Sequence, residues 1–204
     1  SFLINAITYV FVVIALLRMR ESEFFISEKK ETLGTIREGL NYALARPDLY
    51  VVMMVVFFVA TFGLNNQIFN ALMATEAFGK GPAAFGLLGT YLAIGSLSGA
   101  LFSARLEKYR RATFVIKLGI VFSIGVIGLS LAPTFTWYAI WLPFVGFCAL
   151  TLLIAANSLI QVNSDPAIRG RVSGIYLLIF MGGTPFGSPV IGWLAEVIGI
   201  RQTI

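Results

Sequence analysis

Long apolar runs without charges alternate with polar connections along this chain of 204 residues. A helix of about 20 apolar residues crosses the hydrocarbon core of a bilayer. Six runs reach or approach that length, and none holds an Asp, Glu or Arg in its interior. They occupy residues 1–17, 49–75, 83–103, 112–132, 137–160 and 172–195. The pattern predicts an all-α membrane protein in which these runs are transmembrane helices.

The connection formed by residues 18–48 is much longer than the others and contains a second helical pattern. After a charged stretch of mixed sign, apolar residues recur at helical spacing with polar residues opposite them. The apolar positions are Leu33, Ile36, Leu40 and Leu44, and the polar ones are Arg37, Glu38 and Asn41. We expect a short amphipathic helix on the cytoplasmic surface, ended by Pro47, which can open the next span.

Basic residues are concentrated in every second connection. Of the 15 Lys and Arg residues, 13 lie in residues 18–46, 104–117 and 161–171, and the other two are Lys80 and Arg201. In membrane proteins the cytoplasmic connections carry the excess of positive charge. We therefore expect these three connections in the cytoplasm. The net charge of +5 is then expected to meet lipid headgroups rather than nucleic acid.

The composition excludes several classes of protein and of chemistry. With 58% hydrophobic and 12% charged residues, the chain is too apolar for a soluble globular domain or a disordered one. It has no His and a single Cys, Cys148, which excludes histidine catalysis, histidine metal sites and intrachain disulfides. No cluster of carboxylates lies at span depth. We expect neither an enzyme nor a bound cofactor or metal.

Three stretches of the chain carry more specific patterns. They are REGLNYALARPDLYVVM, NNQIFNALMATEAFGKGPAAFGLLGTYLAIGSLSGALFSARL and NSLIQVNSDPAIRGRVSGIYLLIFMGGTPFGSPVIGWLAEVIG. The third is the most specific, because a D-x-x-x-R-G-R turn and a T-P-x-G-S-P helix occur in it in that order. Together they resemble the major facilitator superfamily of transporters, in the drug-efflux and siderophore-exporter-like branch that includes the enterobactin exporter and macrolide efflux proteins.

The resemblance implies a major-facilitator-type helical bundle, of which this chain is part of the C-terminal six-helix half. Residues 1–17 would end the sixth helix, residues 18–48 would form the linker, and residues 49–204 would carry helices seven to eleven. Because the first run opens at Ser1 and the chain stops at Ile204, we expect a larger protein with an N-terminal half and a twelfth helix. The implied location is the cell (inner) membrane, with a small-molecule substrate and protons as partners.

One cytoplasmic motif of the family is altered in this chain. The family pattern G-x-x-x-D-R-x-G-R-R corresponds here to GALFSARLEKYRR, in which Ala104 replaces the acid. Arg105, Arg110 and Arg111 keep the positive charge of the motif. The altered motif does not predict a charge relay at this connection.

Neutral polar side chains inside the runs are the candidates for binding a substrate. Asn66, Gln67 and Asn70, directly preceded by Asn65, form the richest group, and they lie roughly 25–30 Å from the cytoplasmic boundary at a rise of 1.5 Å per residue. They predict either a polar lip of the transport cavity with a locally broken helix, or amide bonds between helices. The further candidates are Tyr91 and Thr184 near mid-membrane and Asn157 near the cytoplasmic end of its run, where an interfacial cap is the alternative.

Glycine and proline residues in the last long run affect how its helix bends and packs. Pro185 and Pro189 remove backbone hydrogen bonds, while Gly183 and Gly187 allow another helix to approach closely. These four residues predict a kinked, tightly packed helix that acts either as a hinge or gate or as a static bend. Gly95 and Gly99 predict a second close-packing ridge.

Charged residues at the cytoplasmic turns are candidates for a latch. Asp165 can cap the following helix, and the arginines can bind headgroups or pair with acids on neighbouring connections. The residues are Asp165, Arg169, Arg171 and Arg105.

The function predicted from all these features is proton-coupled export of small amphipathic molecules by alternating access. Because the run interiors hold no acid, the titrating carboxylate is expected in the N-terminal half. Three alternatives stay open: an importer of a small organic solute, a uniporter, and a non-transporting membrane subunit.

Overall fold

The computed structural model describes residues 2–18, 35–105 and 111–204. It divides into two units, residues 1–34 and 35–204, which are described separately. The first unit contains one apolar helix, α1, at Phe2–Leu17. The predictions for Leu33, for the charged stretch before it and for Arg110 lie outside the described residues.

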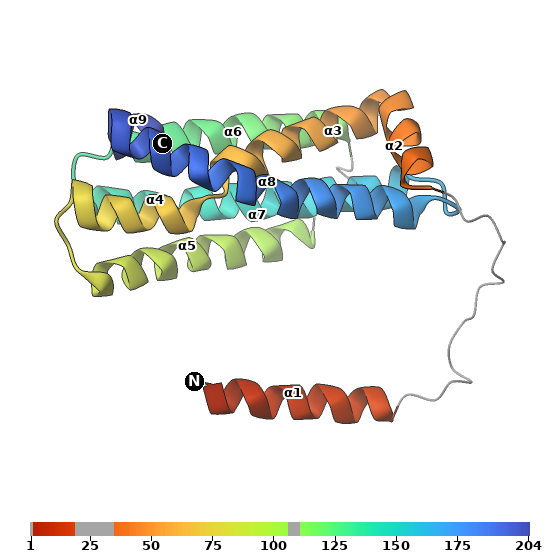
Figure 1. The fold of residues 1–204 in the computed structure, drawn as a ribbon, viewed down its shortest axis with the longest axis horizontal. Coiled ribbons are helices and arrows are strands. Elements are labelled where there is room, and N and C mark those ends of the chain that lie inside the picture. The colour runs from red at the N-terminus through yellow and green to blue at the C-terminus, as the bar shows by residue number, and fades with distance from the viewer. Residues whose placement is uncertain (1, 19–34, 106–110) are drawn as a thin grey trace. The chain divides into compact units, whose positions relative to one another are not determined.

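The second unit is a bundle of long helices that run side by side (Figure 1). The Pro47–Ala77 span consists of α3 at Pro47–Phe58, η2 at Val59–Gly63, α4 at Asn66–Leu72 and η3 at Met73–Ala77. It is followed by α5 at Pro82–Ser103, α6 at Ala112–Ser130, α7 at Phe135–Asn163, α8 at Arg169–Ile198 and α9 at Ile200–Thr203. Within the described part of the chain, five helices are long and apolar enough to cross a membrane. The all-α membrane architecture predicted from the runs is confirmed.

Local sequence explains where these helices begin. Pro47 and Pro82 each stand in the first turn of a helix, where a missing N–H has no intrahelical partner to lose. The backbone N–H of Trp137 donates to the Thr134 hydroxyl at 3.3 Å and caps the start of α7. Gly79 and Gly199 turn the chain between helices, with positive φ of 59° and 88°, a region that favours glycine.

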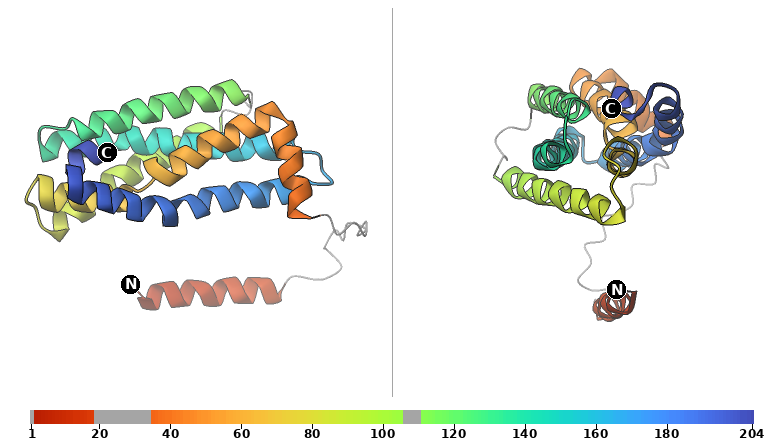
Figure 2. Two further views of the ribbon diagram at one scale, coloured as in Figure 1. Left: turned by 45° about the horizontal axis from the view of Figure 1, so that its top comes forward. Right: turned by 90° about the vertical axis from the view of Figure 1, so that its left-hand side faces the viewer.

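A short helix, α2 at Ile36–Ala45, lies across one end of the bundle (Figures 1 and 2). The ends of α5 and α7 and the starts of α6 and α8 lie at that same end. The described basic residues of these connections from residue 35 onward therefore share one end, as the alternation of charge predicts.

The two remaining basic residues lie at the opposite end, over aromatic rings. Arg201 donates to the backbone carbonyl of Ala132, and its guanidinium carbon lies 5.4 Å from the centre of the Phe78 ring. The ammonium of Lys80 lies 5.1 Å from the centre of the Phe135 ring. Cation–π contacts therefore hold both charges against the protein.

Figure 2 shows α3 inclined across the bundle between α6 and α8.

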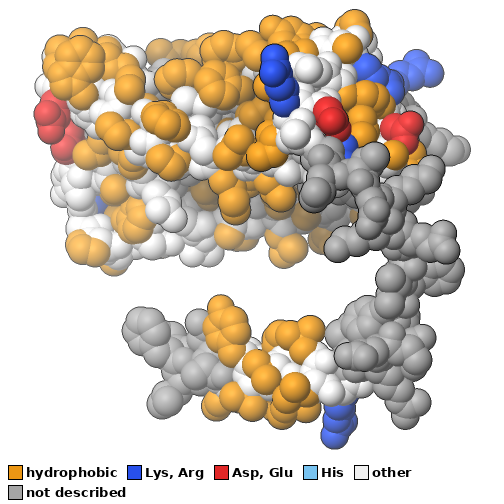
Figure 3. Space-filling view, turned by 45° about the vertical axis from the view of Figure 1, so that its right-hand side comes forward, with side chains coloured by type: hydrophobic (Ala, Val, Ile, Leu, Met, Phe, Trp, Pro, Cys, Tyr) orange, Lys and Arg blue, Asp and Glu red, His pale blue; other side chains and the backbone are white. Residues whose placement is uncertain are grey.

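Hydrophobic side chains cover the flank of the bundle in Figure 3, and charged ones are few. Large apolar residues of the long helices are exposed, for example Leu97 and Met181. This is the surface that a bilayer covers, because lipid tails are as apolar as the side chains they touch.

Glycines bring α5 and α7 into backbone contact. A Cβ atom at Gly95 would collide with the carbonyl of Pro143, and one at Gly99 would lie 2.5 Å from the carbonyl oxygen of Phe147. The Thr151 hydroxyl donates to the carbonyl of Gly99 at 3.4 Å. Small residues allow this approach, and packing replaces the hydrophobic effect as the force between helices in lipid. The second close-packing ridge predicted from the sequence is present.

The contact between α5 and α7 gives a prediction for stability. Replacing Gly95 by Ala forces the two backbones apart, which we expect to lower the free energy of unfolding by about 1–3 kcal/mol. Gly89→Ala is the matched control on the same helix, because a Cβ atom there meets nothing within 4 Å. Thermal unfolding of the purified protein in detergent measures both. Equal melting temperatures for the two variants would contradict the close approach.

Candidate functional site

The Pro47–Ala77 span is interrupted near its middle, at the amide-rich segment. The η2 segment is a π-helix, in which the Leu64 N–H donates to the carbonyl of Val59 at 2.9 Å. Leu64 and Asn65 then leave helical geometry, with ψ of 18° and 36°, before α4 begins at Asn66. The locally broken helix that the sequence predicts is therefore present. Short π-helical segments are frequent at functional sites.

The broken segment is packed against the glycines of α8. A Cβ atom at Gly183 would lie 2.5 Å from the Thr61 hydroxyl, and one at Gly187 would collide with the carbonyl of Thr61. Both glycines are buried, whereas Pro185 and Pro189 are exposed on the other side of α8. The close approach predicted for Gly183 and Gly187 is present, and its partner is η2. The hinge role of these four residues stays a prediction.

A side-chain bridge joins the break to α8. The Asn65 amide nitrogen donates to the carbonyl of Thr61 at 2.8 Å, and the Ser188 hydroxyl donates to the Asn65 amide oxygen at 2.8 Å. Asn65 is 3% exposed, so both bonds are shielded from water. A backbone carbonyl at a helix break needs such a partner, because lipid provides none.

Asn70, one of the predicted binding residues, contacts α7. The Tyr138 hydroxyl donates to its amide oxygen at 3.0 Å, and both residues are buried. At Asn70 the geometry therefore favours an amide bond between helices over a polar lip of the transport cavity. It does not bring Asn70 to an open surface.

The other predicted binding residues are not gathered into one site. Gln67 and Thr184 are exposed, while Asn66 and Tyr91 are half-buried. The Gln161 side chain donates to the Asn157 amide oxygen at 2.6 Å, one turn along the same helix. Asn157 therefore makes a local bond within α7 rather than capping a helix end.

Arg46 is the single residue between α2 and α3, and it is the centre of a cluster at the end of the bundle. Its guanidinium donates to both carboxylate oxygens of Asp48 at 3.2 and 3.0 Å and to the carbonyl of Asn163 at 2.8 Å. It also donates to the Tyr42 hydroxyl at 3.2 Å. These hydrogen bonds, the one to Tyr42 first, raise the pKa of Arg46 above its usual value, so the guanidinium stays charged.

The same cluster extends to α7 and to the turn before α8. The Asn163 amide nitrogen donates to Asp48 at 3.0 Å, and the backbone N–H of Asp165 donates to the Tyr42 hydroxyl at 3.2 Å. These bonds connect α2 to the start of α3 and to the C-terminal end of α7. We call Tyr42, Arg46, Asp48 and Asn163 the α2 clamp.

The predicted latch residues lie beside this clamp, with one exception. Arg171 forms an ion pair with Glu38 of α2 at 3.0 Å, as its predicted pairing with a neighbouring acid requires. Asp165 accepts the backbone N–H of Ala167 at 2.9 Å, so it caps the turn before α8 and not α8 itself, which begins after Ile168. Arg169 donates to the carbonyl of Ser164 at 3.4 Å.

Arg105, the fourth latch residue, lies elsewhere. It is exposed at the rim of a groove of about 350 Å³ between α5 and α7. The structure therefore pairs Arg171 with α2, bonds Arg169 to the turn before α8, and does not add Arg105 to them.

The apolar face of α2 is turned away from the bundle. Gly39 and Ala43 are buried, and a Cβ atom at Gly39 would lie 3.0 Å from that of Arg171. Ile36, Leu40 and Leu44 are exposed. The small residues Gly39 and Ala43 on the opposite face of α2 pack against the bundle instead. The apolar pattern therefore did not indicate which face of α2 is buried.

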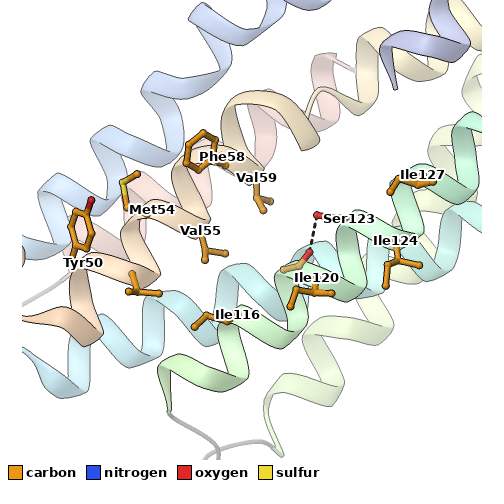
Figure 4. A pocket seen from close by; sticks show the side chains of 12 residues that line it. Tyr50, Met54, Val55, Phe58, Val59, Ile116, Ile120, Ser123, Ile124 and Ile127 are labelled. Carbon is orange, nitrogen blue, oxygen red and sulfur yellow. Dashed lines mark hydrogen bonds between the residues drawn. The ribbon is translucent and has the colours of Figure 1, made fainter.

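A groove between α3 and α6 forms an apolar hollow with a volume of about 460 Å³ (Figure 4). Its lining includes Met54, Phe58, Ile120 and Ile124. The hydroxyl of Ser123 donates to the carbonyl of Gly119 in its own helix at 3.0 Å. The groove can thus bury hydrocarbon but offers little to orient a polar ligand, and none of the predicted binding residues lines it.

Sequence reasoning missed the α2 clamp and the Thr61–Asn65–Ser188 bridge. Asp48 directly after Pro47 was a usable signal, because a carboxylate at the start of a span needs a cation nearby. Ser188 gave no comparable signal. In the described ranges, no three His, Cys, Asp or Glu residues lie close enough together to hold a metal ion.

The α2 clamp gives a prediction for local stability. Arg46→Ala removes four hydrogen bonds, which we expect to lower the free energy of local opening of α2 by about 1–2 kcal/mol. Hydrogen exchange of the amides of residues 36–45 measures this opening. Arg37→Ala is the control, because Arg37 is exposed on the same helix. Exchange as slow in Arg46→Ala as in the control would show that the cluster does not hold α2.

Breaking the bond between Tyr138 and Asn70 tests whether Asn70 has a structural role or binds substrate. Tyr138→Phe leaves the buried amide of Asn70 without its donor, and we expect the free energy of unfolding to fall by about 1 kcal/mol. Tyr50→Phe, on an exposed tyrosine, is expected to have no effect. Thermal unfolding with and without substrate measures both variants. Unchanged stability together with weaker substrate binding in Tyr138→Phe and Asn70→Ala would instead make Asn70 a binding residue.

Comparisons with known proteins agree with the resemblance seen in the sequence motifs. A model of a major facilitator family, described as transmembrane secretion effector, matches residues 1–204. A curated relative, the multidrug efflux pump Tap of Mycolicibacterium fortuitum, is 29% identical over 177 residues. The match covers 84% of this chain and 42% of the relative, so the chain spans less than half of that protein's length. No solved structure matches the chain. The chain belongs to the transmembrane secretion effector family of the major facilitator superfamily, a family of membrane transporters and not of enzymes.

Proposed function

We propose that the whole protein exports small amphipathic molecules across the cell (inner) membrane in exchange for protons. The observation that carries the proposal is the family match over residues 1–204, together with a relative that is named a multidrug efflux pump. The apolar groove between α3 and α6 and the apolar flank show that this part of the protein offers hydrocarbon surface. Amphipathic substrates reach such a surface from the bilayer.

In this proposal the chain is one of two halves that rock against each other. Residues 49–204 supply helices seven to eleven, and the N-terminal half of the same transporter is the partner. The connections at the α2 end face the cytoplasm, which the excess of Lys and Arg supports. The glycines and prolines of α8 act as its hinge, and the pair of Arg171 with Glu38 acts as a cytoplasmic latch.

The proton-binding carboxylate belongs to the N-terminal half. Of the acids within the five described spans, Asp48 is bound by Arg46 and Asn163, and Glu76 and Glu196 lie near helix ends. None of the three stands near mid-membrane, where transporters bind their coupling ions. Asn66, Gln67, Tyr91 and Thr184 remain the proposed substrate contacts in this half, and Asn70 and Asn157 are weaker ones because each has a protein partner.

Efflux from proteoliposomes tests this proposal. We expect uphill export of a lipophilic drug when a pH gradient is imposed on the full-length protein. Replacing each intramembrane Asp or Glu of the N-terminal half by Asn or Gln is expected to abolish coupling in at least one variant. Glu76→Gln and Glu196→Gln are controls that should keep it.

Each other outcome counts against a stated part of the proposal. If every N-terminal variant keeps export fully coupled to protons, the proton-binding carboxylate does not lie in the N-terminal half. Substrate entry driven by the same gradient would identify an importer, and flux indifferent to the gradient a uniporter. Absence of any substrate-stimulated flux would indicate a non-transporting membrane subunit.

A further inference from the structure

The bridge through Asn65 joins the broken Pro47–Ala77 span to α8, the helix with two internal prolines, at a single level. On one side is the end of the π-helical segment η2, and on the other is the Gly183–Pro189 segment of α8. The bridge consists of the Ser188 hydroxyl, the Asn65 amide and the carbonyl of Thr61, with both hydrogen bonds at 2.8 Å. Its residues lie far apart in sequence, so the bond reports on the relative position of the two helices.

We propose that Asn65 and Ser188 are positioning residues for transport, which make the break in the Pro47–Ala77 span and the proline segment of α8 move as one unit. This inference rests on the proposed transport function. It assigns a role to two residues outside the predicted hinge and binding sets.

Backbone chemistry explains why an asparagine stands at the break. Thr61 lies near the end of η2, where carbonyls lose their regular backbone partners, and the Asn65 amide nitrogen donates to its carbonyl instead. The amide oxygen remains free to accept a bond, and Ser188 donates to it. The amide nitrogen of Asn65 thus bonds the carbonyl at the break, and its amide oxygen links the break to α8.

The glycines beside Ser188 bring α8 close enough for this bond. The buried surface of Gly187 lies against the carbonyl of Thr61, and Gly183 lies against the Thr61 hydroxyl. Pro185 and Pro189 flank these contacts on the exposed side. A change in the bend of α8 at the prolines must therefore displace Thr61 and Asn65, because no gap between the helices absorbs it.

The Thr61 hydroxyl is left unsatisfied at this contact. It is buried against Gly183 and has no hydrogen-bond partner in the described part of the chain. A threonine in a helix can donate to the carbonyl one turn earlier, here that of Phe57. The hydroxyl lies against Gly183 instead, so η2 and α8 are packed closely enough at this level to move together.

The test compares transport kinetics of hydroxyl variants. Ser188→Ala removes only the bond to Asn65 and leaves the Asn65 bond to Thr61 in place. We expect the maximal efflux rate of the full-length protein to fall about fivefold or more while the KM for the drug changes less than about twofold, since a positioning residue acts on the movement and not on substrate binding. Ser188→Thr keeps the hydroxyl and is expected to restore the rate. Ser130→Ala is the control, because that hydroxyl bonds only within α6.

A double-variant cycle tests the coupling itself. We expect Asn65→Ala to slow efflux as Ser188→Ala does, and the double variant to be no slower than the slower single one, because both remove the same link. Rate losses that multiply in the double variant would show that the residues act independently and would overturn the proposal. So would a wild-type efflux rate in Ser188→Ala.

Spin-label distances keep the proposal testable if no transport is found. Labels at Thr75→Cys and Val197→Cys, both exposed, report the spacing of the Pro47–Ala77 span and α8 in a Cys148→Ala background. We expect Ser188→Ala to broaden this distance distribution and Ser130→Ala to leave it unchanged. A lack of flux with broadened distances would refute the transport function and support the joint movement. An unchanged distribution in Ser188→Ala would refute the joint movement, whatever the flux.

Discussion

Backbone amides and carbonyls inside a bilayer have no water to bond, and the rest of this structure depends on that constraint. An unbroken helix satisfies them internally, so most of the chain consists of long helices. Where the Pro47–Ala77 span breaks, the carbonyl of Thr61 receives a side chain instead. The break is therefore tolerated only because Asn65 is present, and only at the level where it is present. Irregular backbone and polar side chains coincide in this protein for the same physical reason.

Three kinds of contact hold the bundle together. Contact between α5 and α7 is made by backbone on backbone, with Gly95 against the carbonyl of Pro143, and leaves no room for sliding. The α2 clamp holds the start of α3 and the end of α7 through charged hydrogen bonds. Contact between η2 and α8 combines an equally close approach, Gly187 against the carbonyl of Thr61, with one side-chain bond from Ser188 to Asn65. Both sides of this last contact carry a backbone irregularity, the break after η2 and the prolines of α8.

The sequence predicted the helices, their approximate bounds and the glycine ridges, because apolar length and small-residue spacing are local properties of the chain. It also predicted the break near Asn65, since amides at that depth disturb a helix. It did not predict which helix each polar group meets. Asn70 bonds to Tyr138 and Asn65 to Ser188, and these pairs depend on how α7 and α8 pack, which no local pattern encodes. The orientation of α2 was missed because Gly39 and Ala43, which carry no apolar signal, make its contact.

The pairing of α5 with α7 imposes an order on biosynthesis. The Ser96 hydroxyl of α5 donates to the carbonyl of Gly146, 50 residues later in the chain, and the Asn65–Ser188 bond spans 123 residues. At a synthesis rate of about 5–20 residues per second, α5 waits roughly 3–10 s for its partner and Asn65 waits roughly 6–25 s. During that interval the exposed glycine face and the open break must be sheltered by other surfaces. The two close helix contacts thus form at different times, α5 with α7 well before η2 with α8.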